Sequence, residues 1–154
     1  MMNLSSKVLA ALSGKTLVTA ESLTGGGIGA ALTAVSGASA VYKGGIVSYT
    51  NAVKHSVLGV PEEILETYGA VSQKTAACMV AGVRNLLNAD VAVSVTGLAG
   101  PGGDEYGNPV GTVFIGYEDA KQSVVKHCLF SGSREEIRIR TIETALQIIL
   151  AYNA

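Results

Sequence analysis

The sequence predicts an α/β fold, a three-layer α/β/α sandwich with a mixed β-sheet. Three observations predict it. β-prone segments alternate with helical ones along the first two thirds of the chain, and residues 90–95 (DVAVSV) form a continuous β-branched run, as in strands buried on both faces. Segments 111–117 and 123–130 are joined by a short polar stretch, which indicates a hairpin. No repeat or linker interrupts the 154 residues, so we expect a single domain over 1–154.

The first third of the chain predicts helix, strand, turn, helix and strand. Apolar residues in 4–12 have helical spacing, and Gly14 is placed to end that helix. Residues 16–20 (TLVTA) form a short strand that leads into the glycine turn 24–29 and the helical segment AALTAV. Residues 45–49 (GIVSY) predict a second strand.

Three further helices are predicted from their first residues. Pro61 at the first helical position opens a short helix with acids in its first turn, and Gly69 ends it. Ser72 caps a longer helix with the apolar positions Ala76, Met79, Val80, Val83, Leu86 and Leu87. Ser133-x-x-Glu136 is a capping box for the last helix, whose buried side is Ile137, Ile142, Ala145, Leu146, Ile149 and Leu150.

Composition excludes several classes of protein. Hydrophobic residues make up 48% and charged residues 15%, which excludes a disordered chain. The net charge of −1 offers no basic surface for nucleic acid or membrane. Asn3, Ser5, Ser6 and Lys7 interrupt the apolar stretch that a signal segment would need, and no stretch has the length of a membrane span. We therefore expect a cytoplasmic protein, with Cys78 and Cys128 as buried free thiols and a disulfide between them as the minor alternative. So little charge implies a subunit contact or glycine backbone against a ligand, and the composition leaves both open.

Several known motifs fail on inspection. Gly25-x-Gly27-x-x-Ala30 follows a strand like a dinucleotide fingerprint, but no acidic residue occurs between Glu21 and Glu62 to hold a ribose. Two histidines and no cysteine pair at ligand spacing argue against a zinc site, so no metal is expected. No G-x-S-x-G elbow or complete P-loop is present. A nicotinamide-dinucleotide dehydrogenase is thus a remote alternative.

Polar clusters follow three predicted strands: residues 21–24, residues 48–51 with Lys54 a turn later, and residues 96–103. The carboxyl ends of parallel strands meet at one edge, where open α/β sheets bind ligands. The helix that opens at Thr24 offers free N–H groups, and the acid-free stretch carries Lys43, Lys54 and His55, which favours an anionic ligand. The alternative is that these residues are ordinary turn and cap residues.

These same segments carry a family resemblance. They are residues 20–26 (AESLTGG), 45–54 (GIVSYTNAVK), 68–72 (YGAVS), 95–103 (VTGLAGPGG), 109–113 (PVGTV) and 130–138 (FSGSREEIR). In order, and from about residue 4 to 150, the sequence resembles the C-terminal domain of the competence/damage-inducible protein CinA. The chain is too short for the additional N-terminal domain of full-length CinA, so we expect the stand-alone form.

The resemblance implies a nicotinamide-nucleotide amidohydrolase. Such an enzyme hydrolyses nicotinamide mononucleotide to nicotinic acid mononucleotide and ammonia in pyridine nucleotide salvage. The resemblance also implies that no cofactor is needed and that the chain forms a homodimer or higher homo-oligomer. A catalytically inactive nucleotide-binding or regulatory paralogue, using the same pocket, is the second hypothesis.

Amide hydrolysis needs a nucleophile, a base and oxyanion donors, and a lysine serves as base where an apolar site lowers its pKa. With no suitably placed His or Cys, we expect Ser22 as nucleophile and Lys54 as base, with Tyr49 relaying the proton or orienting the lysine. Ser39 matches a family site position and is the rival hydroxyl. Substrate binding is assigned to Thr24, Gly25, Gly26, Thr96 and Gly97, with Arg134 or Arg138 on the 5′-phosphate.

The sequence departs from the family pattern at two places. Leu23 stands where the family usually has Cys, which implies that this thiol is dispensable. Asn108 stands where members typically have Lys, which puts phosphate or ribose contacts from the 102–109 loop in doubt.

Overall fold

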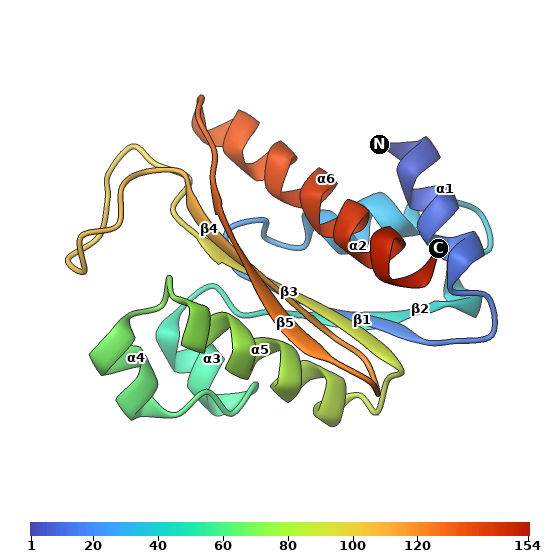
Figure 1. The fold of residues 1–154 in the computed structure, drawn as a ribbon, viewed down its shortest axis with the longest axis horizontal. Coiled ribbons are helices and arrows are strands. Elements are labelled where there is room, and N and C mark those ends of the chain that lie inside the picture. The colour runs from blue at the N-terminus through green and yellow to red at the C-terminus, as the bar shows by residue number, and fades with distance from the viewer.

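A five-stranded mixed sheet lies between two layers of helices in the computed structural model, which describes residues 1–154 (Figure 1). The strand order is β2-β1-β3-β4-β5. β2, β1 and β3 run parallel, and the pairs β3–β4 and β4–β5 are antiparallel, so that β4 alone runs in the opposite direction. The strands are β1 (Leu17–Glu21), β2 (Tyr42–Val47), β3 (Val91–Gly97), β4 (Thr112–Glu118) and β5 (Ser123–Leu129). The predicted sandwich and its hairpin are confirmed.

Six α-helices form the two outer layers. Figure 1 shows α1, α2 and α6 above the sheet and α3, α4 and α5 below it. The upper helices are α1 (Met2–Ala11), α2 (Gly27–Thr33) and α6 (Arg134–Asn153), and the lower ones are α3 (Asn51–Ser56), α4 (Glu62–Tyr68) and α5 (Gln73–Leu86). A short 3-10 turn, η1 (Ala38–Ala40), precedes β2.

Strand β1 is buried along its whole length and contributes to both faces of the sheet. Side chains alternate along a strand, so Leu17 joins the apolar cluster beneath α1, α2 and α6, while Val18 and Ala20 join the cluster beneath α5. Strand β3 is likewise buried on both sides up to Thr96, as its β-branched run predicts. Two apolar layers therefore fix the strand ends at which the polar clusters lie.

The helix starts largely agree with the sequence signals. Ser72 accepts from the backbone N–H of Thr75, and the capping box of Ser133 and Glu136 is complete. Pro61 is the N-cap of α4 rather than its first helical residue, so that prediction is wrong by one position. A Pro at the N-cap is possible because its φ is compatible with the extended backbone found there.

Three elements differ from the sequence prediction. α2 begins at Gly27, not at Thr24, because residues 24–26 form the turn before it. β2 begins at Tyr42 and ends at Val47, not over 45–49, because parallel pairing with β1 keeps Lys43 and two glycines in the strand despite their weak β-propensity. Helix α3 was not predicted. It is only six residues long and has no apolar period, although Thr50 caps it by accepting from Val53 N–H.

The carboxylate of Glu21 fastens the end of β1 to the start of α2. It accepts from Thr24 Oγ1 at 2.6 Å, Ile28 N–H at 2.8 Å and Gly29 N–H at 3.0 Å, and its side chain is buried. A carboxylate at a helix N-terminus satisfies N–H groups that have no partner within the helix. Gly26, the N-cap, has φ +100°, which other residues rarely adopt.

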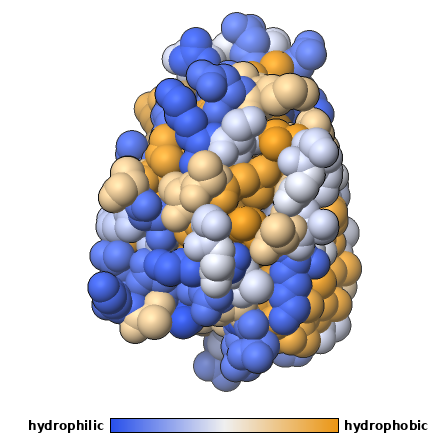
Figure 2. All heavy atoms as spheres, turned by 90° about the vertical axis from the view of Figure 1, so that its right-hand side faces the viewer, coloured by the Kyte–Doolittle hydropathy of each residue, from blue (hydrophilic) through white to orange (hydrophobic).

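The surface reflects the low charge of the chain. Figure 2 shows the face at the right of Figure 1, with apolar side chains between polar ones in the middle and at the lower right. Val47, Tyr49 and Leu129 are among the large side chains that are exposed. Both cysteines are free, but only Cys128 is buried and Cys78 is half-buried. None of the helices combines the length and apolar character needed to cross a bilayer. The oligomer stays a prediction.

We predict that Glu21→Gln destabilises the fold by about 2 kcal/mol and Glu21→Ala by more, because backbone N–H groups at the start of α2 lose a charged acceptor. Urea denaturation monitored by circular dichroism measures both values. Glu63→Gln, in the exposed first turn of α4, is the matched control and should stay within about 0.5 kcal/mol of the original chain. Equal effects of the two amide substitutions would contradict the role of Glu21.

Candidate active site

A buried lysine lies against a buried serine where β1 and β2 end. Lys54 Nζ is 3.0 Å from Ser22 Oγ, 2.7 Å from the carbonyl oxygen of Ser48 and 3.2 Å from that of Tyr49. The side chains of Lys54 and Ser22 are 1% and 6% exposed. The three acceptors account for all three hydrogens of an ammonium group.

The topology explains how residues distant in sequence meet. Glu21 pairs with Val47 in the parallel register of β1 and β2, so Ser22 and Ser48 follow side by side. Ser48 N–H donates to the carbonyl of Glu21 at 2.8 Å, and Ser22 N–H to that of Val95 at 3.0 Å. Helix α3 starts four residues after β2, and Lys54 on it reaches back over the strand ends.

Lys54 has no carboxylate partner. Glu21 precedes Ser22 directly, but alternation along the strand directs its carboxylate to the opposite face of the sheet, where α2 holds it. The chain's salt bridges are His55–Glu62 and Arg84–Glu118, and neither involves Lys54. Desolvation by burial lowers the pKa of Lys54 to about 8. A large fraction of this amine is therefore neutral near pH 8.

The contacts of Lys54 also fix the direction of its lone pair. A neutral amine has two N–H bonds, and carbonyl oxygens can only accept. With those two bonds directed at the carbonyls of Ser48 and Tyr49, the lone pair is left facing Ser22 Oγ. This is the arrangement that a general base needs toward a hydroxyl nucleophile.

The glycine turn after Ser22 presents backbone donors. Gly25 N–H donates to the carbonyl of Ser22, and Gly27 N–H to that of Thr24, whereas the N–H groups of Leu23, Thr24 and Gly26 donate to no group in the chain. The Thr24 hydroxyl is used by Glu21, so only its backbone is free for a ligand. Unused N–H groups beside a nucleophile are typical of an oxyanion hole.

Two arginines from the start of α6 border the site. Arg138 donates through Nε to the carbonyl of Leu23 at 2.9 Å and through a second nitrogen to that of Thr24 at 3.3 Å. Arg134 donates to the carbonyl of Gly100 at 2.6 Å and to the hydroxyl of Tyr49 at 3.3 Å. Both guanidinium groups keep further N–H donors for a ligand.

Tyr49 relates to Lys54 through its backbone. Its carbonyl accepts from Lys54, while its side chain is 60% exposed and its hydroxyl is with Arg134. The structure thus places it to orient the lysine through the main chain, and it shows no contact by which the phenol would relay a proton.

Thr96 and Gly97 lie beside Ser22, but the Thr96 hydroxyl already has a hydrogen-bond partner and Gly97 is closely packed. The Thr96 hydroxyl donates to the carbonyl of Ala70 at 2.7 Å, and Gly97 packs so closely on β4 that a Cβ there would be 2.7 Å from Val113 Cγ2. Ser39 is not brought to this cluster. It lies in η1, just before β2 begins, and therefore at the N-terminal ends of the parallel strands, whereas Ser22 and Lys54 lie at their C-terminal ends in the same chain.

Of the three cationic residues in the acid-free stretch, only Lys54 reaches the site. Lys43 donates to the carbonyl of Leu87, and His55 lies between the carbonyl of Val60 and Glu62. Asn108 donates to the carbonyl of Val71 and to Asp104, so it stabilises its own loop.

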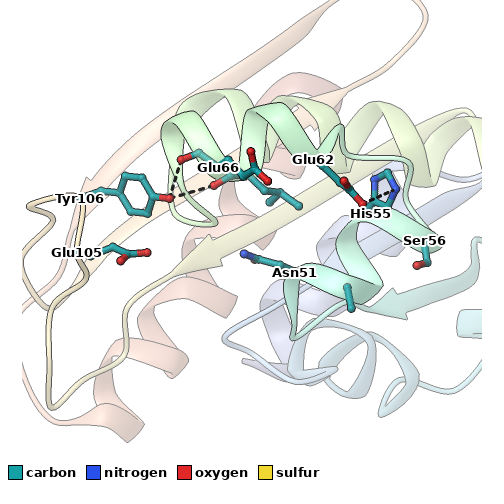
Figure 3. Close-up of a pocket in the computed structure, with 9 residues that line it drawn as sticks. Asn51, His55, Ser56, Glu62, Glu66, Glu105 and Tyr106 are labelled. Atoms are coloured by element: carbon teal, nitrogen blue, oxygen red, sulfur yellow. Dashed lines mark hydrogen bonds and ion pairs between the residues drawn. The ribbon is translucent and has the colours of Figure 1, made fainter.

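Two adjoining cavities lie between α3, α4 and the 98–110 loop. The larger, about 470 Å³, is lined by Asn51, Ala52, His55, Ser56, Glu62, Leu65, Glu66, Glu105 and Tyr106. The second, about 270 Å³, shares Asn51, Glu105 and Tyr106 and adds Ala70, Val71, Leu98 and Asp104. Figure 3 shows Asn51 extending from α3 into the space facing Glu105, and Tyr106 reaching α4, where its hydroxyl donates to the carbonyl of Glu66. The sequence analysis missed Glu62, Glu66, Glu105 and Tyr106, because no motif links α4 to this loop.

Comparison with known proteins decides the family. The model of the CinA C-terminal domain matches residues 2–152. The chain belongs to the CinA C-terminal domain family.

Two relatives of this family match 90% and 73% of the chain. A CinA-like protein of Sulfurihydrogenibium is 47% identical over 138 residues, which are 90% of this chain and 34% of the relative. A CinA-like protein of Parasynechococcus marenigrum is 54% identical over 115 residues, which are 73% of this chain and 27% of the relative. This chain thus spans about a third of the length of these curated relatives. Solved structures of a competence/damage-inducible protein from Agrobacterium tumefaciens and of competence damage-inducible protein A from Klebsiella pneumoniae both give a TM-score of 0.95. The Agrobacterium protein is 39% identical, and the match covers 99% of this chain and 95% of that protein. The Klebsiella protein is 36% identical, and the match covers 97% of this chain and 94% of that protein.

We predict that the stability of this CinA-family chain rises with pH through the titration of Lys54. The pKa is about 8 in the folded chain and 10.5 as an ordinary lysine, so between these values the unfolded chain binds more protons and raising the pH favours folding. The gain from pH 8 to pH 10 is about 2 kcal/mol. Urea denaturation at both pH values, compared with Lys54→Met, isolates this contribution. The prediction fails if the two chains show the same pH dependence.

Proposed function

We propose that this chain is an amidohydrolase that converts nicotinamide mononucleotide to nicotinic acid mononucleotide and ammonia. The observation that carries the proposal is the buried Lys54, without a carboxylate partner and 3.0 Å from Ser22 Oγ. Ser–Lys pairs of this kind activate a hydroxyl for acyl transfer. Family membership and the backbone donors of the glycine turn support the same reaction class.

In the proposed first half-reaction, Lys54 accepts the proton of Ser22 Oγ as this oxygen bonds to the carboxamide carbon. The carbonyl electron pair moves onto the oxygen, and the unused N–H groups of Leu23, Thr24 and Gly26 stabilise that oxyanion. The ammonium of Lys54 then gives its proton to the leaving nitrogen. Collapse of the tetrahedral intermediate breaks the C–N bond, releases ammonia and leaves an ester on Ser22.

In the second half-reaction, a water molecule attacks the ester. Neutral Lys54 accepts a proton from that water, and the second tetrahedral intermediate collapses with return of the proton to Ser22 Oγ. The products are the pyridine carboxylic acid and the free enzyme. Ser22 and water are the two nucleophiles, and Lys54 carries out the proton transfers, so this reaction is proposed to need no metal or organic cofactor.

The surroundings of the pair support a phosphorylated substrate. Arg134 and Arg138 border the turn next to Ser22 and keep free donors, which suits a 5′-phosphate. The cavities beside Asn51 are lined by the carboxylates of Glu62, Glu66, Asp104 and Glu105 and by neither Ser22 nor Lys54. We therefore assign the phosphate to the arginines rather than to that acidic cavity, which would repel it.

We predict that the purified chain releases ammonia from nicotinamide mononucleotide, and that Ser22→Ala and Lys54→Met each lower kcat by about a thousandfold or more. Because the base must be neutral, kcat/KM should rise with pH through about 8. Enzyme-coupled ammonia detection measures both, and circular dichroism checks the fold of each variant.

The same assay separates the alternatives. A Ser39→Ala variant that loses activity while Ser22→Ala keeps it would move the nucleophile to Ser39. An increase in the Tm with nicotinamide mononucleotide but no ammonia would support the non-catalytic binding paralogue instead.

We predict that Arg134→Ala raises KM for nicotinamide mononucleotide about tenfold while kcat changes little, since a phosphate contact made equally in ground and transition states affects binding alone. Nicotinamide riboside, which has no phosphate, should show no such difference between the two enzymes. Arg138→Ala should lower kcat as well, because Arg138 holds the carbonyls of the turn that carries the oxyanion donors. Arg140→Ala, on the exposed side of α6, is the control. A KM change of equal size with the riboside would refute the phosphate assignment.

A further inference from the structure

The hydroxyl of Ser48 is buried without a hydrogen-bond partner. Ser48 is 0% exposed, and only one other buried side-chain polar atom in the chain, Ser5 Oγ in α1, is also unpartnered. A buried polar group without a partner destabilises a fold, and such groups are few in native proteins. Their persistence calls for an explanation, and catalytic sites are where one is commonly found.

Ser48 lies on the same side of the sheet as Ser22. A Cβ placed at Gly26 would lie 3.5 Å from Val47 Cγ2, so Val47 faces α2. Alternation along the strand then directs Ser48 to the other face, toward α3. Its own carbonyl oxygen holds Lys54 Nζ at 2.7 Å, so the unpartnered hydroxyl belongs to the residue in shortest contact with the ammonium.

The ammonium of Lys54 has its full set of acceptors only while Ser22 Oγ is free. The carbonyls of Ser48 and Tyr49 take two hydrogens and Ser22 Oγ takes the third. In both tetrahedral intermediates of the reaction proposed above, Lys54 is an ammonium while Ser22 Oγ is bonded to the substrate carbon and is a weaker acceptor. Until the proton moves on, the third hydrogen of the ammonium therefore lacks its acceptor inside a buried site.

We propose that Ser48 is a positioning residue whose hydroxyl serves as the reserve hydrogen-bond acceptor for Lys54 whenever Ser22 Oγ is not available. It keeps the ammonium in place while Ser22 Oγ is bonded to the tetrahedral carbon and the proton has not yet moved on, and in that respect the inference rests on the proposed function. The resting enzyme leaves the hydroxyl unpartnered because Ser22 occupies the third position. Ser48 is thus a residue that acts through Lys54 and does not touch the reacting atoms.

The other ionisable groups around Lys54 do not offer this acceptor. On α3, His55 is held by Val60 and Glu62; from β1, Glu21 lies on the far face with α2; and after β2, the phenol of Tyr49 is with Arg134 of α6. Burial alone accounts for the lowered pKa of Lys54. Removal of a hydroxyl acceptor should therefore register directly in the titration of this lysine.

The test is a double-mutant cycle that needs no activity. Ser22→Ala removes the third acceptor, which the bond from Ser22 Oγ to the substrate carbon weakens in the tetrahedral intermediates. In that background, Ser48→Ala should lower the pKa of Lys54 by about 1, a tenfold change in its protonation equilibrium, and by less than half of that where Ser22 is present. NMR titration of the Lys54 side-chain 13Cε signal measures the four chains. Ser5→Ala removes the other unpartnered buried hydroxyl and should leave the titration unchanged.

Stability and turnover complete the test. Ser48→Ala should keep or raise the Tm, since it removes an unsatisfied group, and should lower kcat for nicotinamide mononucleotide about fivefold with KM unchanged; Ser48→Thr should restore most of kcat. Equal Lys54 titrations with and without Ser48 in the Ser22→Ala background, or a Ser48→Ala chain that does not fold, would overturn the proposal. Absence of ammonia release by the unmodified chain would refute the proposed function alone, because the titration cycle still decides the role of Ser48.

Discussion

The chemistry of this site depends on the burial of one ammonium group without a counter-charge. Lys54 is enclosed at the ends of β1 and β2 and contacts two backbone carbonyls and one hydroxyl. A carboxylate in their place would stabilise the charged form and keep the lysine protonated near neutral pH. Carbonyl dipoles orient the amine with partial charges only, so desolvation prevails and the pKa falls to about 8.

The carboxylate closest in sequence is kept away by strand geometry. Glu21 and Ser22 are consecutive, yet the pleat sends one to each face of the sheet. The Glu21 carboxylate accepts hydrogen bonds from N–H groups at the start of α2 and from the Thr24 hydroxyl. These bonds shape the turn that presents the free backbone N–H groups beside Ser22. The Glu21 carboxylate, which organises the turn, therefore lies on the opposite face from the Ser22 hydroxyl, which contacts the amine. The acid-free stretch that follows likewise places no carboxylate beside Lys54.

The sequence predicted those features that depend on local patterns and missed those that depend on packing. The β-branched run of β3, the cap at Ser72 and the convergence of Ser22 with Lys54 follow from periodicity, capping chemistry and the rule that parallel strands end at one edge. Helix α3 was missed because six residues without an apolar period carry no helical signal, and Lys43 was grouped with Lys54 although they lie toward opposite ends of β2. The cavity carboxylates of α4 and Glu105 meet only through the fold of the 98–110 loop.

The unpartnered hydroxyl of Ser48 is consistent with a site in which the hydrogen-bond partners of Lys54 change during the reaction. A site optimised for the resting enzyme alone would hold an alanine there, since the lysine already has three acceptors. In the tetrahedral intermediates Ser22 Oγ is bonded to the substrate carbon, so the ammonium keeps only two good acceptors. A buried ammonium with a missing acceptor would either lose its proton early or leave its position. A spare acceptor on the residue that already holds the amine prevents both, at a small cost in the stability of the free enzyme.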